Sequence, residues 1–189
     1  MDTAGHRTPP TEAAGVVLAA GAGRRFGGPK AEVRYLGERF VDRAVRLLRD
    51  GGCVRVVVVS GAVPLRVDGA TVVHNPGWAG GMGSSLATGL RAVHEGAAVV
   101  VPVDMPWLGP DAVRRLRHSG ARLAVATYAG RPGHPVLLGA EYFPAVTETA
   151  VGDIGARKFL AANTELVQHI PCDGTGSPED VDTPQDLIR

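Results

Sequence analysis

Residues 18–30 read LAAGAGRRFGGPK, and four of these thirteen positions are glycine. The apolar residues 15–20 lead into this stretch and are predicted to form a strand that ends in a loop. Because glycine has no Cβ, a loop of this kind lets a ligand approach backbone N–H groups closely. Two adjacent arginines and Lys30 stand in the same stretch, and fixed cations beside such groups suit a polyphosphate. The stretch therefore predicts a triphosphate-binding loop.

Two common phosphate-binding loops do not match this stretch. Lys30 lies between a proline and an alanine, so the Ser or Thr that would hold magnesium in a Walker A loop is missing. Gly21, Gly23 and Gly27 are spaced G-x-G-x-x-x-G, which is one residue too long for the dinucleotide fingerprint. No acidic residue ends the next predicted strand near Ser60, where a ribose partner would be expected. We therefore do not expect a nicotinamide enzyme.

The composition is that of one folded domain. The chain has 189 residues, of which 44% are hydrophobic and 21% charged. A net charge of +1 argues against a nucleic-acid-binding or membrane-binding surface, and no apolar run approaches the ~18 residues that a membrane span requires. Cys53 and Cys172 lie far apart and match no metal-ligand spacing. They are expected to be reduced thiols of a cytoplasmic protein.

Residues 1–13 are polar and lack the apolar core of a signal peptide. We expect them to be a disordered N-terminal extension. The remaining residues 14–189 contain no Pro/Ser-rich linker, internal repeat or low-complexity tract, so they are predicted to form a single domain.

Apolar runs and helical periodicities alternate along this domain. The predicted strands cover residues 15–20, 53–60, 71–74, 97–103, 122–127 and 165–170. Helices are predicted over residues 40–48, around Leu86 and Leu90, from Pro110, over residues 152–160 with Asp153 as N-cap, and after Thr183. Residues 131–138 are assigned to no element. Such alternation favours an α/β fold with a parallel or mostly parallel sheet.

Several polar residues follow predicted strands, where the ligands of open α/β sheets bind. Asp104 ends the most hydrophobic run and is suited to hold Mg²⁺, which prefers one or two carboxylates together with substrate phosphates. Asn75 and residues 80–85 form a second glycine-rich loop, in which Ser84 or Ser85 is a candidate N-cap for the next helix. His134 lies between a glycine and a proline in a loop able to present it to a second substrate.

The opening stretch resembles the nucleotidyltransferase signature L-A-A-G-x-x-x-R-M/F-G-x-x-K. Five further blocks follow in order: NPGWAGGMGSSLATGL (75–90), VPVDMPWL (101–108), RPGHPVLL (131–138), GDIGAR (152–157) and DVDTPQDL (180–187). Together they resemble the cytidylyltransferase branch of the molybdenum cofactor guanylyl- and cytidylyltransferases. This resemblance implies a single three-layer αβα domain with a Rossmann-like, mostly parallel sheet of the nucleotide-diphospho-sugar transferase type.

The resemblance also implies roles for particular residues. Arg25 and Lys30 would neutralise the triphosphate, and Asp104 would hold Mg²⁺. Asp182 would be a second metal ligand or a structural turn residue, and it ranks ahead of Asp180. The nucleotide-binding residues would be Leu18, Ala19, Ala20, Gly21, Gly23, Arg25, Lys30, Asn75, Gly81, Ser84 and Ser85. The acceptor-binding residues would be His134, Asp153 and Arg157.

The reaction implied is transfer of CMP from CTP to molybdenum-molybdopterin with release of pyrophosphate, and the implied protein partner is a molybdenum hydroxylase or its chaperone. Two alternatives stay open. One is a related enzyme that uses GTP or a sugar phosphate, and the other is a non-catalytic module that binds and delivers the molybdenum cofactor.

Overall fold

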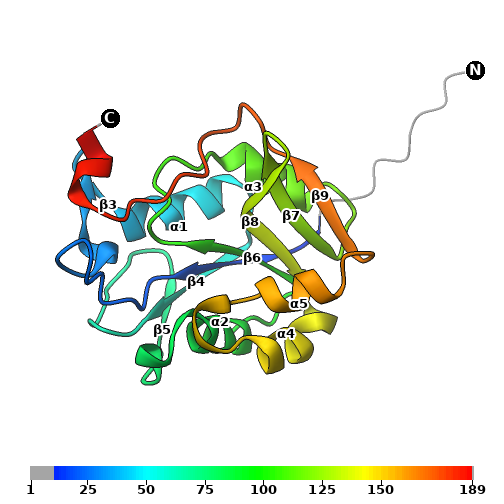
Figure 1. Ribbon diagram of the computed structural model, residues 1–189, viewed down its shortest axis with the longest axis horizontal. Helices are drawn as coiled ribbons and strands as arrows, with labels where there is room; N and C mark the ends of the chain where they lie inside the picture. The colour runs from blue at the N-terminus through cyan, green and yellow to red at the C-terminus, as the bar shows by residue number, and fades with distance from the viewer. Residues whose placement is uncertain (1–10, 189) are drawn as a thin grey trace, which may run out of the picture.

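The computed structural model describes residues 11–188, which form a seven-stranded sheet with helices on both faces (Figure 1). The strand order is β5-β4-β1-β6-β8-β7-β9. The strands are β1 (Ala14–Leu18), β4 (Arg55–Ser60), β5 (Thr71–His74), β6 (Ala97–Pro102), β7 (Leu123–Tyr128), β8 (Arg131–Gly139) and β9 (Val167–Pro171). All neighbours pair in parallel except β8, which runs antiparallel to both β6 and β7. The predicted α/β fold with a mostly parallel sheet is confirmed.

The helices divide between the two faces of the sheet. One face carries α1 (Phe40–Asp50) and α3 (Pro110–Arg117), and the other carries α2 (Met82–Arg91), α4 (Phe143–Thr149) and α5 (Arg157–Ala162) (Figure 1). Short 3₁₀ turns occupy Lys30–Glu32, Trp78–Gly80, Ala140–Tyr142, Gly152–Ile154 and Pro184–Ile188. Within residues 11–188, no helix is both long and apolar enough to cross a membrane.

Alternating side chains of the central strands build two separate cores. On β1, Val17 packs with the cluster under α1 and α3, whereas Val16 packs with the cluster under α2 and α4. On β6, Val99 and Val100 divide in the same way. All four side chains are at most 4% exposed. A strand buried on both faces needs continuous apolar sequence, which is why β1, β4 and β6 were recognisable from their valines.

Strand β8 was missed because prolines and a glycine fill its first half. Residues 131–135 contain two prolines, which donate no hydrogen bond to a ladder. The second half is different, since Val136, Leu137 and Leu138 are buried and pair with β6 in the register Val100↔Val136. The β7–β8 ladder shifts register between Val125 and Thr127. Strand β8 therefore forms because β6 and β7 pair with it along the sheet.

Three predictions about helix ends are wrong in part. Asp153 does not cap α5, which begins at Arg157 after Ala156; it lies in the Gly152–Ile154 turn, and its Oδ1 accepts the Met82 N–H at 3.3 Å. Ser84 and Ser85 lie inside α2 and are not its N-cap, which is Gly81. The element after Thr183 is a 3₁₀ turn and not an α-helix, although Asp186 Oδ2 does accept the Thr183 N–H at 2.8 Å as a capping box requires.

The boundary of the predicted N-terminal extension also needs correction. Residues 1–10 lie outside the described residues. Residues 11–13, however, pack against the domain: the Thr11 N–H donates to the Arg117 carbonyl at 2.8 Å, and Ala13 is fully buried. The packed chain therefore begins before residue 14.

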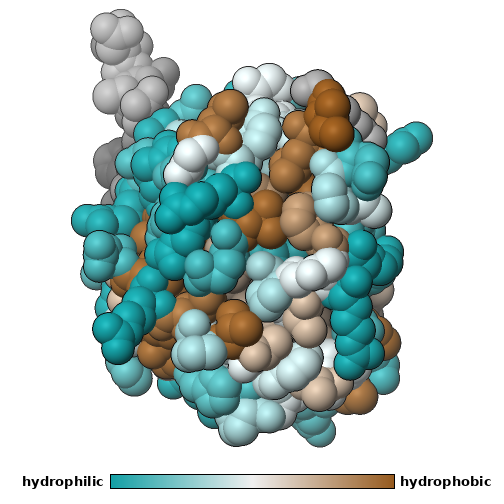
Figure 2. All heavy atoms as spheres, turned by 90° about the vertical axis from the view of Figure 1, so that its left-hand side faces the viewer, coloured by the Kyte–Doolittle hydropathy of each residue, from teal (hydrophilic) through white to brown (hydrophobic). Residues whose placement is uncertain are grey.

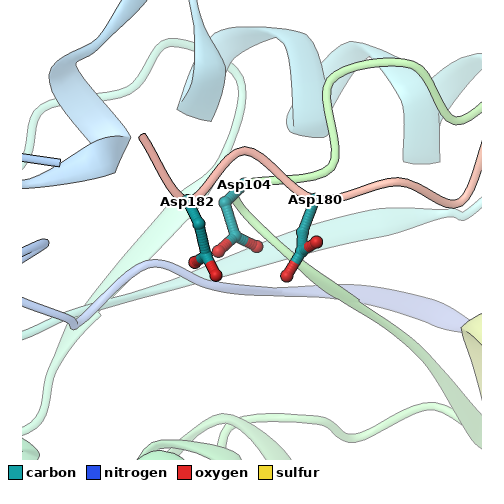
Figure 3. A group of neighbouring side chains, drawn as sticks. All are labelled: Asp104, Asp180 and Asp182. Atoms are coloured by element: carbon teal, nitrogen blue, oxygen red, sulfur yellow. The ribbon is translucent and has the colours of Figure 1, made fainter. Parts of the chain in front are cut away.

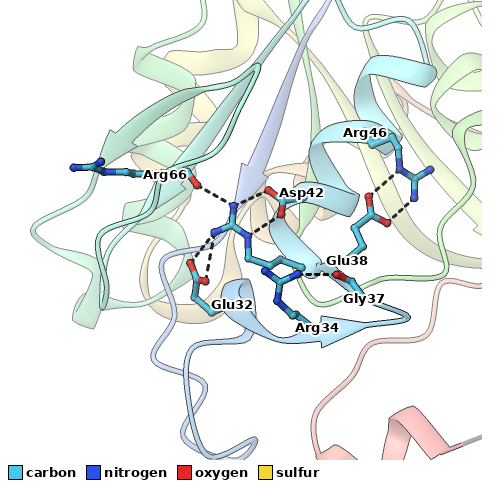
Figure 4. A network of polar contacts seen from close by, with 8 residues as sticks. Glu32, Arg34, Gly37, Glu38, Asp42, Arg46 and Arg66 are labelled. Carbon is cyan, nitrogen blue, oxygen red and sulfur yellow. Dashed lines mark hydrogen bonds and ion pairs between the residues drawn. The ribbon is translucent and has the colours of Figure 1, made fainter.

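A small antiparallel hairpin, β2 (Arg34–Tyr35) and β3 (Glu38–Arg39), follows the phosphate-binding loop. Arg39 joins Glu32 in the Lys30–Glu32 turn to Asp42 in α1, and Arg46 holds Glu38 (Figure 4). This network connects the turn that carries Lys30 to the first turns of α1, so the backbone that presents the lysine is anchored on both sides.

Candidate active site

The functional residues meet at the carboxyl ends of the parallel strands. The glycine loop follows β1, Asn75 follows β5, and Asp104 follows β6. Because these strands run in parallel, their ends lie along one edge of the sheet. The C-terminal segment returns to this edge, where the Val181 N–H donates to the Asp104 carbonyl at 2.9 Å.

The glycine loop, predicted to bind phosphate, is a tight turn organised by Gly23. The carbonyl oxygen of Gly23 accepts the N–H groups of Phe26, Gly27 and Gly28 at 3.0, 3.0 and 3.1 Å. Gly23 has φ +61°, and a Cβ at this position would overlap with the Gly28 carbonyl, so only glycine fits. Within the described chain, the N–H groups of residues 21–25 donate to no protein acceptor. These groups, and not those of Phe26, Gly27 and Gly28, are open to a phosphate.

Lys30 connects the loop to two carboxylates from distant parts of the chain. Its Nζ donates to Asp104 Oδ2 and to Asp182 Oδ1, both at 2.9 Å, and the side chain is 14% exposed. Burial by itself lowers the pKa of Lys30, but the hydrogen bonds and attraction of the two carboxylates outweigh it, and the pKa is raised above its ordinary value. The same hydrogen bond lowers the pKa of Asp182. Arg25 reaches Asp182 Oδ2 at 3.0 Å but is 78% exposed, so this contact is weak.

Three aspartates converge here. Asp104 follows β6, and Asp180 and Asp182 come from the C-terminal segment; each offers an oxygen within 4.8 Å of the other two. Figure 3 shows the three carboxylates pointing to the same side of this segment. The sequence analysis ranked Asp180 behind Asp182. It could not show that the C-terminal segment runs antiparallel to residues 104–107, which brings Asp180 as well as Asp182 close to Asp104. Two carboxylates one residue apart in a D-x-D pattern were the available signal.

This donor set fits a small divalent cation. Magnesium and manganese take oxygen ligands and are held by one or two carboxylates with phosphates and waters completing the shell. Asp104 and Asp182 are the predicted pair, and the geometry adds Asp180 as a third oxygen donor. The predicted nucleotide loop and metal ligands therefore form one constellation.

A cavity of about 380 Å³ lies beside this constellation. It is lined by most of the predicted nucleotide-binding residues: Leu18, Ala20, Gly21, Gly23, Arg25, Lys30, Gly81 and Ser85. Trp78 and Met82 also line it, so an aromatic and a thioether side chain are available to pack against a base. The face of the molecule that carries the loop mixes polar and apolar side chains (Figure 2).

Three predicted nucleotide-binding residues are placed differently. Ala19 is 3% exposed and packs in the core. Asn75 is 3% exposed, and its amide is engaged within the second loop, donating to Ser84 and Ser85 Oγ and accepting the Gly77 N–H at 2.9 Å. Ser84 does not line this cavity. Asn75 and Ser84 therefore brace the loop that follows β5.

A second cavity, of about 1020 Å³, contains the predicted acceptor residues His134, Asp153 and Arg157. Its walls include apolar side chains from the sheet and from α5, such as Val136 and Leu160. Leu18, Met82 and Asp153 line both cavities, which therefore adjoin. Asp180 lines the second cavity and Asp104 the first, so the carboxylate cluster stands at their junction.

His134 is neutral in this setting. Desolvation and the nearby Arg157 guanidinium lower its pKa to about 4. Its backbone is fixed by Tyr128, whose hydroxyl donates to the His134 carbonyl at 2.9 Å. At neutral pH the imidazole can therefore donate one hydrogen bond and accept another. Arg157 supplies positive charge in the same cavity.

Residues 15–169 match the family described as the MobA-like NTP transferase domain. A protein named nicotine blue oxidoreductase from Paenarthrobacter nicotinovorans is 39% identical over 192 residues, which cover 93% of this chain and 94% of that protein. A molybdenum cofactor guanylyltransferase from Xanthomonas euvesicatoria is 32% identical, covering 82% and 80%. The molybdenum cofactor cytidylyltransferase of Escherichia coli is 28% identical, covering 65% and 68%.

The crystal structure of Rv0371c from Mycobacterium tuberculosis aligns with a TM-score of 0.81 at 28% identity, covering 95% of this chain and 97% of that one. A second crystal structure of Rv0371c, in complex with manganese, aligns with a TM-score of 0.77 at 27% identity, covering 95% and 97%. The family match spans the glycine loop, Asp104 and the predicted acceptor residues His134, Asp153 and Arg157, whereas Asp180 and Asp182 lie beyond it. The chain belongs to the MobA-like NTP transferase family and is a nucleotidyltransferase.

Proposed function

We propose that this enzyme transfers CMP from CTP to a phosphorylated, molybdopterin-type acceptor and releases pyrophosphate, with Mg²⁺ as its metal ion. The observation that carries the proposal is one carboxylate cluster that reaches both adjoining cavities: Lys30 and Asp104 line the first cavity, and Asp180 of the same cluster lines the second. One cavity has the loop, arginines and lysine that suit a triphosphate, and the other has room for a larger second substrate.

In this reaction the acceptor phosphate attacks the α-phosphorus in line, so no covalent enzyme intermediate is needed. The free N–H groups of residues 21–25 and the cations Arg25 and Lys30 would hold the triphosphate and stabilise the departing pyrophosphate. Asp104 and Asp182, with Asp180 beside them, would hold Mg²⁺, which supplies neutralisation of the phosphate charge. His134 and Arg157 would orient the acceptor.

CTP is proposed as the donor because the loop begins L-A-A-G. The Ala20 side chain lines the nucleotide cavity and is 4% exposed, so its methyl group reduces the space available to a base. A pyrimidine needs less room than a purine in a cavity of about 380 Å³. The guanylyltransferase and cytidylyltransferase relatives leave GTP as the alternative donor.

The test follows two magnesium-dependent readouts with each acceptor, molybdopterin with its molybdenum or a sugar phosphate: transfer of label from α-³²P-CTP or α-³²P-GTP to the acceptor, and release of pyrophosphate. We expect CTP with the molybdopterin acceptor to react, and Asp104→Asn to lower the rate at least ~100-fold because the site loses a metal-holding charge. Asp68→Asn, at an exposed position outside both cavities, is the matched control. If Asp104→Asn releases pyrophosphate as fast as wild type, the metal-binding role proposed for Asp104 is wrong.

If the wild type releases no pyrophosphate with any nucleotide yet binds the molybdenum cofactor, a delivery module replaces the enzyme. The partner proposed for that role, and for receipt of the product, is a molybdenum hydroxylase or its chaperone.

A second candidate function is oxidation or reduction of nicotine blue or a similar compound, favoured by the 39% identity with nicotine blue oxidoreductase over nearly the whole chain. The large apolar cavity has space for a flat aromatic molecule. Against it, the loop has no dinucleotide spacing, and β4 ends in Ser60 followed by Gly61, where an acidic ribose partner would stand. Oxidation of NADH or NADPH by the purified protein, with nicotine blue as the electron acceptor and without any nucleoside triphosphate, would favour this candidate.

A further inference from the structure

The ammonium group of Lys30 bridges two of the three clustered carboxylates. Its Nζ lies 2.9 Å from both Asp104 Oδ2 and Asp182 Oδ1, and both aspartates belong to the cluster that is suited to a divalent cation. The side chain is 14% exposed, so water screens these contacts little. The lysine therefore already provides positive charge between the two predicted metal ligands.

A divalent cation and this ammonium group cannot both use the cluster at full strength. Like charges a few ångströms apart repel strongly in a partly buried site. Asp104 and Asp182 each give one oxygen to Lys30, and Arg25 takes the second oxygen of Asp182. Asp180 is the exposed member of the cluster, and a single exposed carboxylate binds Mg²⁺ poorly because the ion gives up its waters reluctantly.

Lys30 also lines the nucleotide cavity, beside the open N–H groups of the loop. Its backbone is anchored, because the neighbouring Ala31 is 1% exposed and the Arg39 network holds the same turn (Figure 4). The flexible four-carbon stem is then the part that moves. A triphosphate in this cavity offers the ammonium more negative charge than two carboxylates do, and a lysine that turns toward it frees Asp104 and Asp182.

We propose that Lys30 occupies the metal position in the nucleotide-free enzyme, so that a divalent cation binds tightly only after a nucleoside triphosphate has drawn the lysine away. Because coupling between two ligands is reciprocal, metal and nucleotide strengthen each other's binding through this side chain. The inference rests on the metal-dependent nucleotidyl transfer proposed above and adds an order of binding to it.

The experiment measures binding of Mn²⁺ alone, by the loss of its free-ion EPR signal, to wild type, Lys30→Met and Lys30→Gln. Lys158→Met is the matched control, because Lys158 is the chain's other lysine and is exposed on α5 outside both cavities. We expect both Lys30 variants to bind Mn²⁺ at least tenfold more tightly than wild type, and Lys158→Met to bind as wild type does. Equal or weaker Mn²⁺ binding by both Lys30 variants overturns the proposal.

A thermal unfolding measurement shows whether the variants lose stability. Without Lys30 the carboxylates face each other uncompensated, so we expect the Tm of Lys30→Met to fall and to recover when Mn²⁺ is added, while Mn²⁺ shifts the wild-type Tm less. A Tm that Mn²⁺ shifts equally in both proteins contradicts the proposal. Neither readout needs catalysis, so failed pyrophosphate release by the wild type would sink the proposed function and leave this comparison in force.

Discussion

The substitution Gly23→Ala tests whether the loop geometry holds the nucleotide. Gly23 adopts φ +61°, and its carbonyl accepts three N–H groups from residues 26–28. A methyl group at this position would overlap with the Gly28 carbonyl oxygen. Gly28→Ala is the matched control: its added Cβ meets nothing within 4 Å, its φ is not positive, and its N–H still donates to Gly23.

The expected cost follows from these contacts. A left-handed conformation costs alanine about 1–2 kcal/mol relative to glycine. Relief of the overlap opens the turn, and each of the three hydrogen bonds lost costs about 1 kcal/mol. The free protein can open this exposed loop, so the cost falls mainly on the nucleotide-bound state, which needs the turn closed. The penalty is therefore about 1–2 kcal/mol if the turn stays closed and strained and about 3 kcal/mol if its three hydrogen bonds are lost, which corresponds to a roughly 5- to 150-fold loss of affinity.

The assay is isothermal titration of CTP with Mg²⁺ into wild type, Gly23→Ala and Gly28→Ala, with the Tm of each protein recorded. We expect Gly28→Ala to bind within about threefold of wild type, since an unstrained substitution whose Cβ enters open space changes the free energy by about 0.5 kcal/mol. Equal CTP affinity in Gly23→Ala and Gly28→Ala would refute the assignment of this turn to the triphosphate.

Two further predictions concern stability. Burial lowers the pKa of His134 in the folded protein to about 4, whereas its pKa in the unfolded chain is about 6.5. The unfolded chain therefore binds a proton at His134 that the folded protein does not. The free energy of unfolding for this reason decreases as the pH falls from about 6.5 toward 4. Urea unfolding at pH 5 and pH 7 should therefore show a smaller loss on acidification for His134→Gln than for wild type, by up to about 1.4 kcal/mol per pH unit; an identical loss contradicts this reasoning. Leu48→Ala in α1 should lower the free energy of unfolding by about 2–5 kcal/mol, because Leu48 is fully buried and a Cβ on Gly15 would stand 2.7 Å from it. Urea denaturation checks this value, with the exposed Val54→Ala (56% exposed) as control, and a loss as small as that control's would contradict tight packing there.

Much of the candidate site could be read from the sequence because its residues follow strands. A residue just after a buried parallel strand must lie at the carboxyl edge of the sheet, and the structure places the glycine loop and Asp104 at that edge. The same reasoning is weaker for Asn75, which follows β5 but turns its amide into the loop and not toward the cavity. Position along a strand predicts where a backbone goes, whereas the direction of a side chain depends on the hydrogen-bond partners around it.

The α/β class, the two-sided burial of β1, β4 and β6, and the glycine loop after β1 could be recognised from the sequence, because each depends on local patterns of apolar residues and glycine. Tertiary packing alone fixes the antiparallel β8, whose two prolines precede the residues that pair with β6 and lie where the register against β7 shifts. It also decided that Lys30 reaches Asp104 and Asp182, 74 and 152 positions away along the chain, and that Asp180 joins them. Such contacts form because the C-terminal segment crosses the end of β6. Many packing contacts along the chain stabilise that crossing, and no short sequence motif contains them.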